Sequence, residues 1–158
     1  MDPRTADLVD AHGAALRVCD AQFRIYSKRQ SYSGPVRTLQ VFEDNALVKE
    51  TLSTAGDGAV LVVDGAASLR CALVGDVLAG LGATNGWSGL VVWGAVRDAV
   101  ALREMGLGIK ALGTNPARAG KTGAGQLDIP IRFGGVIFRP GDWLYSDADG
   151  IVLSDQRL

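Results

Sequence analysis

Cysteine and histidine are scarce in this sequence, and their scarcity excludes several kinds of site. Two cysteines, Cys19 and Cys71, are too few for a disulfide framework and lack CxxC spacing, so we expect a reducing compartment. His12 is the only histidine, which rules out a multi-histidine zinc site and any Ser–His or Cys–His dyad that does not use it. Its position near the expected end of a helix favours a capping or solvated role.

A surplus of one charge and long apolar runs are also lacking. The formal net charge is -1 at pH 7, so the composition gives no electrostatic sign of a nucleic-acid or membrane partner. No apolar run reaches membrane-spanning length. Residues 1–7 carry acids where a signal peptide needs a basic region and an apolar core. We therefore expect a soluble, cytoplasmic protein.

What the 158 residues do contain is a series of short apolar blocks between glycine-rich turns, which predicts one compact domain over residues 1–158. Apolar runs at 59–63, 90–93 and 109–112 are typical of buried strands. Val74, Val77, Leu78 and Leu81 form an apolar stripe that predicts a first helix. A second helix is expected over 98–105. This alternation predicts βαβ units with parallel strands, which is a mixed α/β fold.

The two ends of the chain are expected to differ from this central region. Thr5 should cap a short helix that stops at Gly13, and residues 20–42 look extended with a break at 33–35. Asp44 should cap a helix that ends near residue 56. The C-terminal part predicts a hairpin and two further short strands, over 129–133, 136–138, 143–145 and 151–153.

Two stretches look like ligand-binding loops but depart from the required patterns. Residues 119–123 read AGKTG, yet Asn115 stands where a phosphate-binding loop needs its first glycine and no helix is favoured afterwards, so we predict a flexible loop or lid. Residues 147–150 read DADG, but the glycine comes too early for a calcium loop and no glutamate follows at the last ligand position. An acidic turn is the prediction there.

A set of charged residues stands at two strand-to-helix transitions. Asp76 is followed, after twenty residues, by Arg97 and Asp98. Either aspartate alone is explained by helix capping. Together they favour a site: Gly75 and the amides after it would bind an anion at a helix N-terminus, Arg97 a carboxylate, and Asp98 magnesium or manganese.

Longer motifs around these residues resemble the 4-hydroxy-4-methyl-2-oxoglutarate aldolases, which are class II pyruvate aldolases grouped with the regulator of ribonuclease E activity A proteins. The resemblance extends over nearly the whole chain. It rests on Phe42-Glu43-Asp44-Asn45, Val62-Val63-Asp64-Gly65, Gly75-Asp76-Val77-Leu78, Gly94-Ala95-Val96-Arg97-Asp98, Gly134-Gly135-Val136 and Gly141-Asp142.

The resemblance implies a ββα swivelling-type fold, like that of phosphohistidine domains, assembled as a homotrimer or a pair of trimers. It also implies a metal-dependent aldolase with oxaloacetate decarboxylase as a second activity. Asp98 would bind Mg²⁺ or Mn²⁺ and Asp76 would hold it through water. Arg97 and the amides of Gly75, Asp76, Val77 and Leu78 would bind the 2-oxo acid. One departure is the short segment after the last strand, where longer aldolases lend residues to a neighbouring subunit.

Several alternatives stay open at this point. A non-catalytic regulator that binds and inhibits ribonuclease E is the competing function. A quinone-pathway methyltransferase, a label that some relatives carry, lacks support because no glycine-rich cofactor motif follows the first strand. The general base is not identified, and Lys110, Arg118 and Lys121 are candidates for binding a distal carboxylate.

Overall fold

The structure is a computed structural model that describes residues 2–158. Its helices are α1 (Thr5–His12), α2 (Ala46–Leu52), α3 (Asp76–Thr84) and α4 (Ala99–Leu102), with a 3-10 turn at Gly13–Ala15. Its strands are β1 (Arg17–Cys19), β2 (Arg24–Ile25), β3 (Tyr32–Gln40), β4 (Val60–Asp64), β5 (Ala72–Val74), β6 (Gly89–Val96), β7 (Gly108–Thr114), β8 (Gln126–Leu127), β9 (Ile131–Phe133), β10 (Val136–Phe138), β11 (Trp143–Ser146) and β12 (Ile151–Ser154). Within these residues, no helix is long and apolar enough to cross a membrane.

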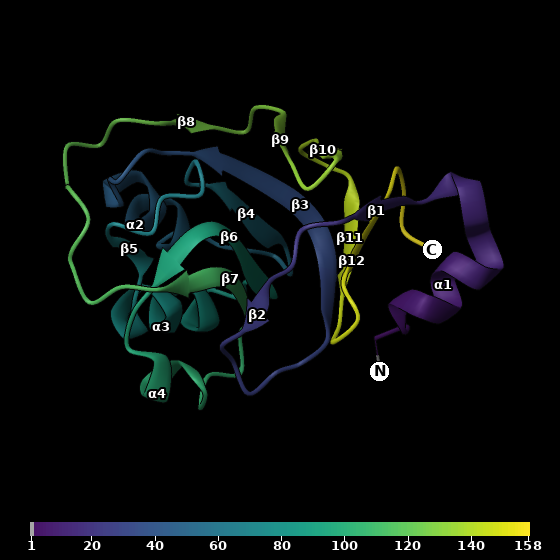
Figure 1. Ribbon diagram of the computed structural model, residues 1–158, viewed down its shortest axis with the longest axis horizontal. Helices are drawn as coiled ribbons and strands as arrows, with labels where there is room; N and C mark the ends of the chain where they lie inside the picture. Colours follow the sequence, from purple (N-terminus) through teal and green to yellow (C-terminus); the bar gives the residue numbers. More distant parts are fainter. Residues whose placement is uncertain (1) are drawn as a thin grey trace.

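A curved sheet organises the molecule (Figure 1). Its centre consists of the parallel strands β3, β4, β6 and β7, which are adjacent in that order. Antiparallel strands extend both sides, with β11, β12 and β1 beside β3 and with β2 beside β7. The mixed α/β class and the parallel βαβ units predicted from the sequence are confirmed.

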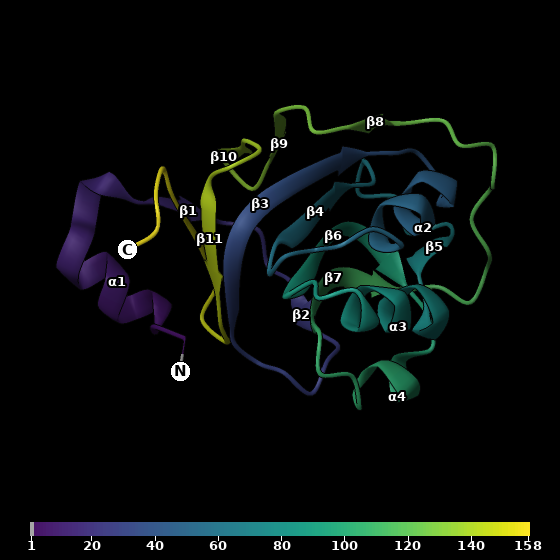
Figure 2. The same cartoon turned by 180° about the vertical axis from the view of Figure 1, so that it is seen from behind.

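The helices α2, α3 and α4 lie in the connections between successive parallel strands and cover one face of the sheet, as Figure 2 shows from behind. The core on this face includes Leu52 from α2, Ala79 from α3 and Leu61 and Val92 from the sheet. All residues of β4 except Asp64 are buried, which explains its continuous apolar run.

The hairpin of β9 and β10 covers part of the opposite face. Its register pairs Val136 with Phe133 across the Gly134-Gly135 turn, so the predicted hairpin is confirmed. Phe133 and Phe138 pack there against Trp93 and Tyr32 among others. The fully buried ring of Tyr32 lies over β6 and β7 and leaves no room for a Cβ at Gly89 or Gly108.

Helix α1 packs on the outer strands at the end of the molecule where both chain ends lie (Figure 1). The prediction that Thr5 caps this helix was wrong, because Arg4 occupies the N-cap position and Thr5 is the first helical residue. Instead, the amide and hydroxyl of Thr5 each donate to the Asp147 carboxylate at 2.7 Å. Asp147 also accepts from the amide of Asp149 at 2.9 Å, which confirms the acidic turn.

Three other predictions about local structure were wrong in detail. Residues 33–35 do not break β3, because Ser33, Gly34 and Pro35 all pair with β11. Val74 belongs to β5 and Val77 is 66% exposed, so the predicted stripe is not the buried face of α3. The buried residues of α3 are Leu78, Ala79 and Gly82. The predicted helix over 98–105 is only one turn long, since α4 ends at Leu102.

Candidate active site

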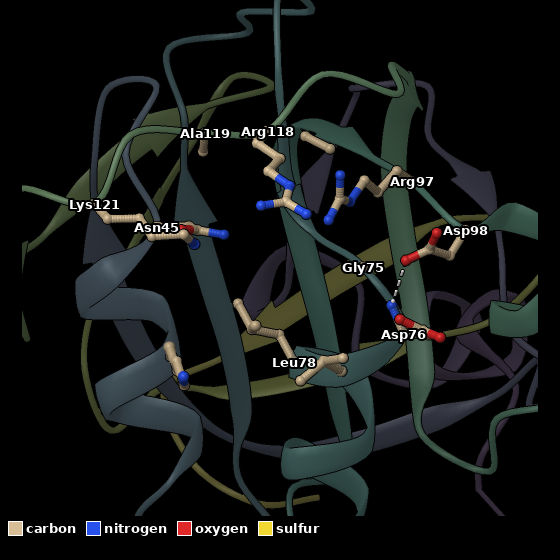
Figure 3. A pocket seen from close by; sticks show the side chains of 12 residues that line it. Asn45, Gly75, Asp76, Leu78, Arg97, Asp98, Arg118, Ala119 and Lys121 are labelled. Atoms are coloured by element: carbon tan, nitrogen blue, oxygen red, sulfur yellow. Dashed lines mark hydrogen bonds between the residues drawn. The ribbon is translucent and has the colours of Figure 1, made fainter.

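The carboxyl ends of the parallel strands meet at one edge of the sheet and form a cavity there. Gly75 follows β5 and Arg97 follows β6, and the pairing of Val74 with Val96 brings them together. The amide of Arg97 extends this pairing by donating to the Val74 carbonyl at 2.9 Å. The cavity has a volume of about 170 Å³ (Figure 3), and its lining consists of Asn45, Lys49, Ala72, Gly75, Asp76, Val77, Leu78, Arg97, Asp98, Arg118, Ala119 and Lys121.

The Asp98 side chain is directed toward the start of α3 and does not cap α4, the helix that follows Asp98 in the chain. Its backbone is left-handed, with φ 59°, and its side chain makes no cap for α4. Instead, Oδ2 accepts a hydrogen bond from the Asp76 amide at 3.0 Å (Figure 3). This amide and the nearby Arg97 guanidinium lower the pKa of Asp98 against the opposing effect of burial, so the carboxylate is ionised at neutral pH.

Gly75 makes the close approach of Asp98 possible. A Cβ on Gly75 would lie 2.5 Å from Oδ2 of Asp98 and 3.3 Å from Cγ of Arg97. Gly75 also occupies the N-cap position of α3, where it provides no side-chain cap. Its lack of a side chain therefore leaves space for the two charged residues that follow β6.

Asp76 is the first residue of α3 and lies at the cavity surface. The N-cap position belongs to Gly75, so capping does not account for the Asp76 carboxylate. The Asp76 amide is already engaged by Asp98, which corrects the prediction that every amide from Gly75 to Leu78 is open to a substrate. Leu78 contributes an apolar, mostly buried wall, whereas Val77 lies at the exposed rim.

Four cationic side chains line the same cavity. The Arg97 guanidinium donates from Nη1 to the Pro116 carbonyl at 3.3 Å, and Figure 3 shows the Arg118 guanidinium beside it. Lys49 and Lys121 complete the set. Among residues 2–158, no carboxylate lies within 4.0 Å of any of these four groups. With only Asp76 and Asp98 to balance them, the cavity favours anionic ligands.

Some of this lining was not predicted from the sequence. Asn45 donates from Nδ2 to the Leu73 carbonyl at 3.2 Å and accepts at Oδ1 from Lys121 at 3.2 Å. Lys49 lies one turn along α2 from Asn45. The available signal was the position of Asn45 between a predicted strand and a predicted helix, the same kind of transition that indicated Asp76 and Arg97.

Of the three cations proposed for a distal carboxylate, the structure brings Arg118 and Lys121 to the cavity but not Lys110. Lys110 is 3% exposed, and its amine donates to the carbonyls of Asp147 at 2.6 Å and Gly150 at 3.0 Å. Burial lowers the pKa of this amine to about 8, against the opposing effect of Asp147. The proposed substrate role of Lys110 was therefore wrong.

The acidic side chains of the cavity fit a metal site with few protein ligands. No cluster of three or more His, Cys, Asp or Glu side chains suitable for a metal occurs within residues 2–158. Asp98 and Asp76 are the two acids of the cavity, and the described residues give Oδ1 of Asp98 no hydrogen bond. Mg²⁺ and similar hard ions bind through one or two carboxylates and keep several waters, so this pair fits such an ion.

Comparison with known proteins identifies the relatives of the chain. It is 43% identical, with a TM-score of 0.97, to a solved structure named S-adenosylmethionine: 2-dimethylmenaquinone methyltransferase from Geobacillus kaustophilus, and the match covers 99% of this chain and 97% of that one. It is also 43% identical, with a TM-score of 0.96, to the RNA-processing inhibitor RraA from Thermus thermophilis, over 100% and 96% of the two chains.

A more distant relative is an unusual member of the RNase ES inhibitor RraA protein family from Streptomyces coelicolor. It is 31% identical with a TM-score of 0.73, and the match covers 94% of this chain and 77% of that one. The family described as RraA-like (Aldolase/RraA) matches residues 5–153. The protein is therefore a member of the RraA-like family, to which aldolases and RNA-processing inhibitors both belong.

Proposed function

We propose that the protein is a metal-dependent aldolase that cleaves 4-hydroxy-4-methyl-2-oxoglutarate into two pyruvates and also decarboxylates oxaloacetate. The observation that carries this proposal is the meeting of Asp76, Arg97 and Asp98 in one cavity with a surplus of positive charge. Both substrates are 2-oxo acids with at least two carboxylates, so they match that charge. The swivelling-type topology and the metal implied by the sequence resemblance belong to the same proposal.

The first task of the site is to hold the 2-oxo acid end of the substrate. Arg97 supplies a planar fork that binds a carboxylate through two parallel hydrogen bonds. Arg118 lies beside Arg97, where it adds a second positive charge to the same part of the cavity. The remaining amides at the start of α3 lie along the same wall and favour an anion. The mostly buried Leu78 side chain contributes an apolar part of the cavity lining.

The chemical step breaks the C3–C4 bond of the substrate. The bonding electrons pass to the pyruvate half as an enolate, and the 4-hydroxyl proton must leave. Arg97 stabilises the negative charge that develops on the 2-oxo oxygen. We assign Asp76 the acceptance of the hydroxyl proton through a water molecule, and the same water can return a proton to C3 of the enolate, which is then released as the second pyruvate. A Mg²⁺ or Mn²⁺ ion bound at Asp98 would supply Lewis-acid stabilisation of the same negative charge. Oxaloacetate gives the same enolate when carbon dioxide is lost.

Two other functions follow from the names of relatives. Inhibition of an RNA-processing enzyme is the second candidate, because a relative with 43% identity carries that name. In that case, inhibition would depend on an exposed surface of the protein and not on Arg97. A methyltransferase role has less support, since the sequence lacks a glycine-rich motif for the cofactor after its first strand.

The deciding experiment measures pyruvate release from 4-hydroxy-4-methyl-2-oxoglutarate and from oxaloacetate, with magnesium and with a chelator. We expect turnover with magnesium and none in chelator. Arg97→Lys should lower kcat/KM by about 100-fold, the usual loss when a group that stabilises developing charge is misplaced. Arg103→Lys, an exposed change just after α4 and outside the cavity lining, is the matched control and should keep full activity.

Full activity in chelator with metal-free protein would contradict the metal-dependent mechanism. An unchanged kcat/KM in Arg97→Lys would contradict the proposed site. If the wild-type protein releases no pyruvate from either substrate yet inhibits a ribonuclease, the second candidate function holds.

A further inference from the structure

The connection between β7 and β8 carries three lining residues of the cavity. Figures 1 and 2 show this segment sweeping around the outside of the molecule past α2 before it reaches β8. Arg118, Ala119 and Lys121 belong to it, and residues 120–128 are all exposed. A glycine-rich, exposed connection of this kind has little packing of its own to fix its course. Its contacts with the rest of the molecule therefore decide where Arg118 and Lys121 lie.

One buried carboxylate accepts three of the four side-chain hydrogen bonds that join residues 118–124 to the rest of the molecule. Asp44 is only 4% exposed. Its Oδ2 accepts from the amide of Thr122 at 2.6 Å and from the Thr122 hydroxyl at 2.8 Å, and its Oδ1 accepts from the amide of Gly123 at 3.2 Å. A fourth bond comes from the amide of Ala46 at 3.3 Å. Hydrogen bonds to an ionised carboxylate are roughly twice as strong as neutral ones.

These bonds give the acid at position 44 a role beyond helix capping. The prediction that Asp44 caps α2 was only partly right, because Asn45 holds the N-cap position. Burial favours the neutral acid, yet the bonds from Thr122, Ala46 and Gly123 outweigh it and hold the pKa of Asp44 below its ordinary value. The carboxylate is therefore charged at neutral pH, and it binds the loop through three hydrogen bonds and the first residue of α2 through one.

Backbone hydrogen bonds beside Asp44 also fix the position of the loop. The Gly120 amide donates to the Glu43 carbonyl at 2.8 Å, and the Asn45 amide donates to the Gly120 carbonyl at 2.9 Å. Gly120 lies so close to Asp44 that a Cβ there would be 3.2 Å from Oδ2. The loop is thus seated along residues 43–45, and Lys121 reaches Asn45 from it.

We propose that Asp44 is a positioning residue that anchors the 118–124 loop and so places Arg118 and Lys121 where they bind the substrate's negative charge. Its consequence for turnover rests on the proposed function. Asp44 itself is not among the lining residues and touches no substrate. It acts through the loop, so its loss should weaken binding much more than it slows the chemical step at Arg97 and Asp98.

The chain offers a matched control in the neighbouring acid. Glu43 accepts from the Ser68 hydroxyl at 2.6 Å and pairs with Arg70 at 2.7 Å, and its side chain makes no bond to the loop in the described residues. Glu43→Gln removes a charge one residue away from Asp44 without removing the anchor. Thr122→Val is a second test variant, because Thr122 is exposed and its hydroxyl bond can be deleted without disturbing the core.

The test combines hydrogen exchange with kinetics on Asp44→Asn, Thr122→Val and Glu43→Gln. In Asp44→Asn we expect faster exchange at the amides of Thr122 and Gly123. We also expect a rise of about 10-fold in KM for oxaloacetate and in the Kd of the dianion oxalate, the lower end of losses from supporting contacts. The kcat and the affinity for Mg²⁺ should change less than about threefold. Thr122→Val should show a smaller shift in the same direction, and Glu43→Gln none.

Unchanged exchange at Thr122 and Gly123, or unchanged KM and oxalate Kd in Asp44→Asn, would overturn the proposal. Equal effects in Glu43→Gln would overturn it too, because they would reflect lost charge rather than a lost anchor. The proposed function fails separately, through the absence of pyruvate release by the wild-type protein. In that case exchange and oxalate binding still decide whether Asp44 positions the loop.

Discussion

At the scale of single residues, the site depends on an unusual backbone at Asp98. Its left-handed conformation turns the carboxylate back toward α3, where it binds the Asp76 amide. Aspartate and asparagine tolerate this conformation better than most residues with side chains. Two requirements therefore meet at one position: an acidic oxygen for the cavity and a backbone that few other residues adopt at low cost. The left-handed conformation costs conformational free energy, and such costs are typically found at functional sites, as is proposed here.

Gly75→Ala tests the steric side of this arrangement. The new Cβ would lie 2.5 Å from Oδ2 of Asp98, so we expect the carboxylate to move off the Asp76 amide. Oxaloacetate decarboxylation should fall about 10- to 100-fold, as when a group that orients a ligand is lost. The control is Gly80→Ala, where the Cβ would meet nothing within 4 Å in the middle of α3. It should gain about 0.5–1 kcal/mol in the free energy of unfolding and keep its activity. Equal activity in both variants would contradict a steric role for Gly75.

The acidic and basic residues of the site were readable from the sequence, whereas their mutual contacts were not. Asp76 and Arg97 stand directly after apolar runs, and parallel strands bring such positions to one edge of the sheet. The bond between Asp98 and the Asp76 amide depends on a positive φ that no local pattern encodes. Lys49 escaped notice because a lysine on a short helix usually lies in solvent, and only the packing of α2 places it at the cavity.

At the scale of elements, Lys110 joins two parts of the sheet. It stands on the parallel strand β7, and its amine reaches the carbonyls of Asp147 and Gly150 in the turn between β11 and β12. The same turn is bound by Thr5 at the start of α1 through the Asp147 side chain. A buried lysine thus connects a central strand to the segment on which α1 packs.

The pKa of Lys110 predicts how stability depends on pH. Burial lowers this pKa to about 8 in the folded protein, while the unfolded chain has an ordinary value near 10.5. Between these values the unfolded chain binds more protons, so the free energy of unfolding should rise with pH over that window and stay flat with respect to this group below it. The integrated rise should not exceed about 3.5 kcal/mol.

Urea denaturation at several pH values between 7 and 10.5, on the wild type and on Lys110→Met, measures this contribution. The difference between the two curves isolates Lys110 from the tyrosines and cysteines that titrate in the same range. We expect the wild-type stability to rise relative to the variant as the pH increases. Parallel curves would show that Lys110 keeps an ordinary pKa in the folded protein.

The elements themselves were predicted well where the apolar period was clear. The strands β4, β6 and β7 and the hairpin of β9 and β10 appear where the sequence indicated. The break predicted in β3 does not occur, because Gly34 and Pro35 pair with β11. This strand pairing overrides the local preference of glycine and proline for turns. Helix α4 ends at Leu102, where the chain tightens into turns: the amides of Glu104 and Met105 donate to carbonyls three residues back, and Gly106 follows.

At the scale of the whole molecule, two exposed valines lie on neighbouring helices near the cavity. Val77 on α3 is 66% exposed and Val100 on α4 is 80% exposed. Large apolar side chains at such positions are often covered by another protein surface. We propose that they lie at the subunit contact of the homotrimer, or of the pair of trimers, that the sequence resemblance implies.

Light scattering on the wild type and on Val100→Lys tests this assembly. The wild type should give about three times the mass of the 16.5 kDa chain, or six times it for a pair of trimers, and the variant should shift toward the monomer. Val18→Lys is the control, because Val18 is 54% exposed on β1 at the opposite end of the molecule. A monomeric wild type would contradict the proposed assembly, and an equal loss of mass in both variants would contradict the location of the contact.

The position of the cavity at the strand ends has a consequence for how members of this family diverge. Asp76, Arg97, Asp98 and Lys121 all lie in connections or at helix starts, while the cores on both faces of the sheet are formed by other residues. We expect substitutions at these four positions to leave the packing of the cores intact, with the largest local cost at Asp98, whose left-handed backbone few other residues adopt easily. The proposed aldolase activity could therefore be lost in a few substitutions while the outer shape of the protein is kept. The same fold would then suit a protein whose function depends on its surface and not on catalysis.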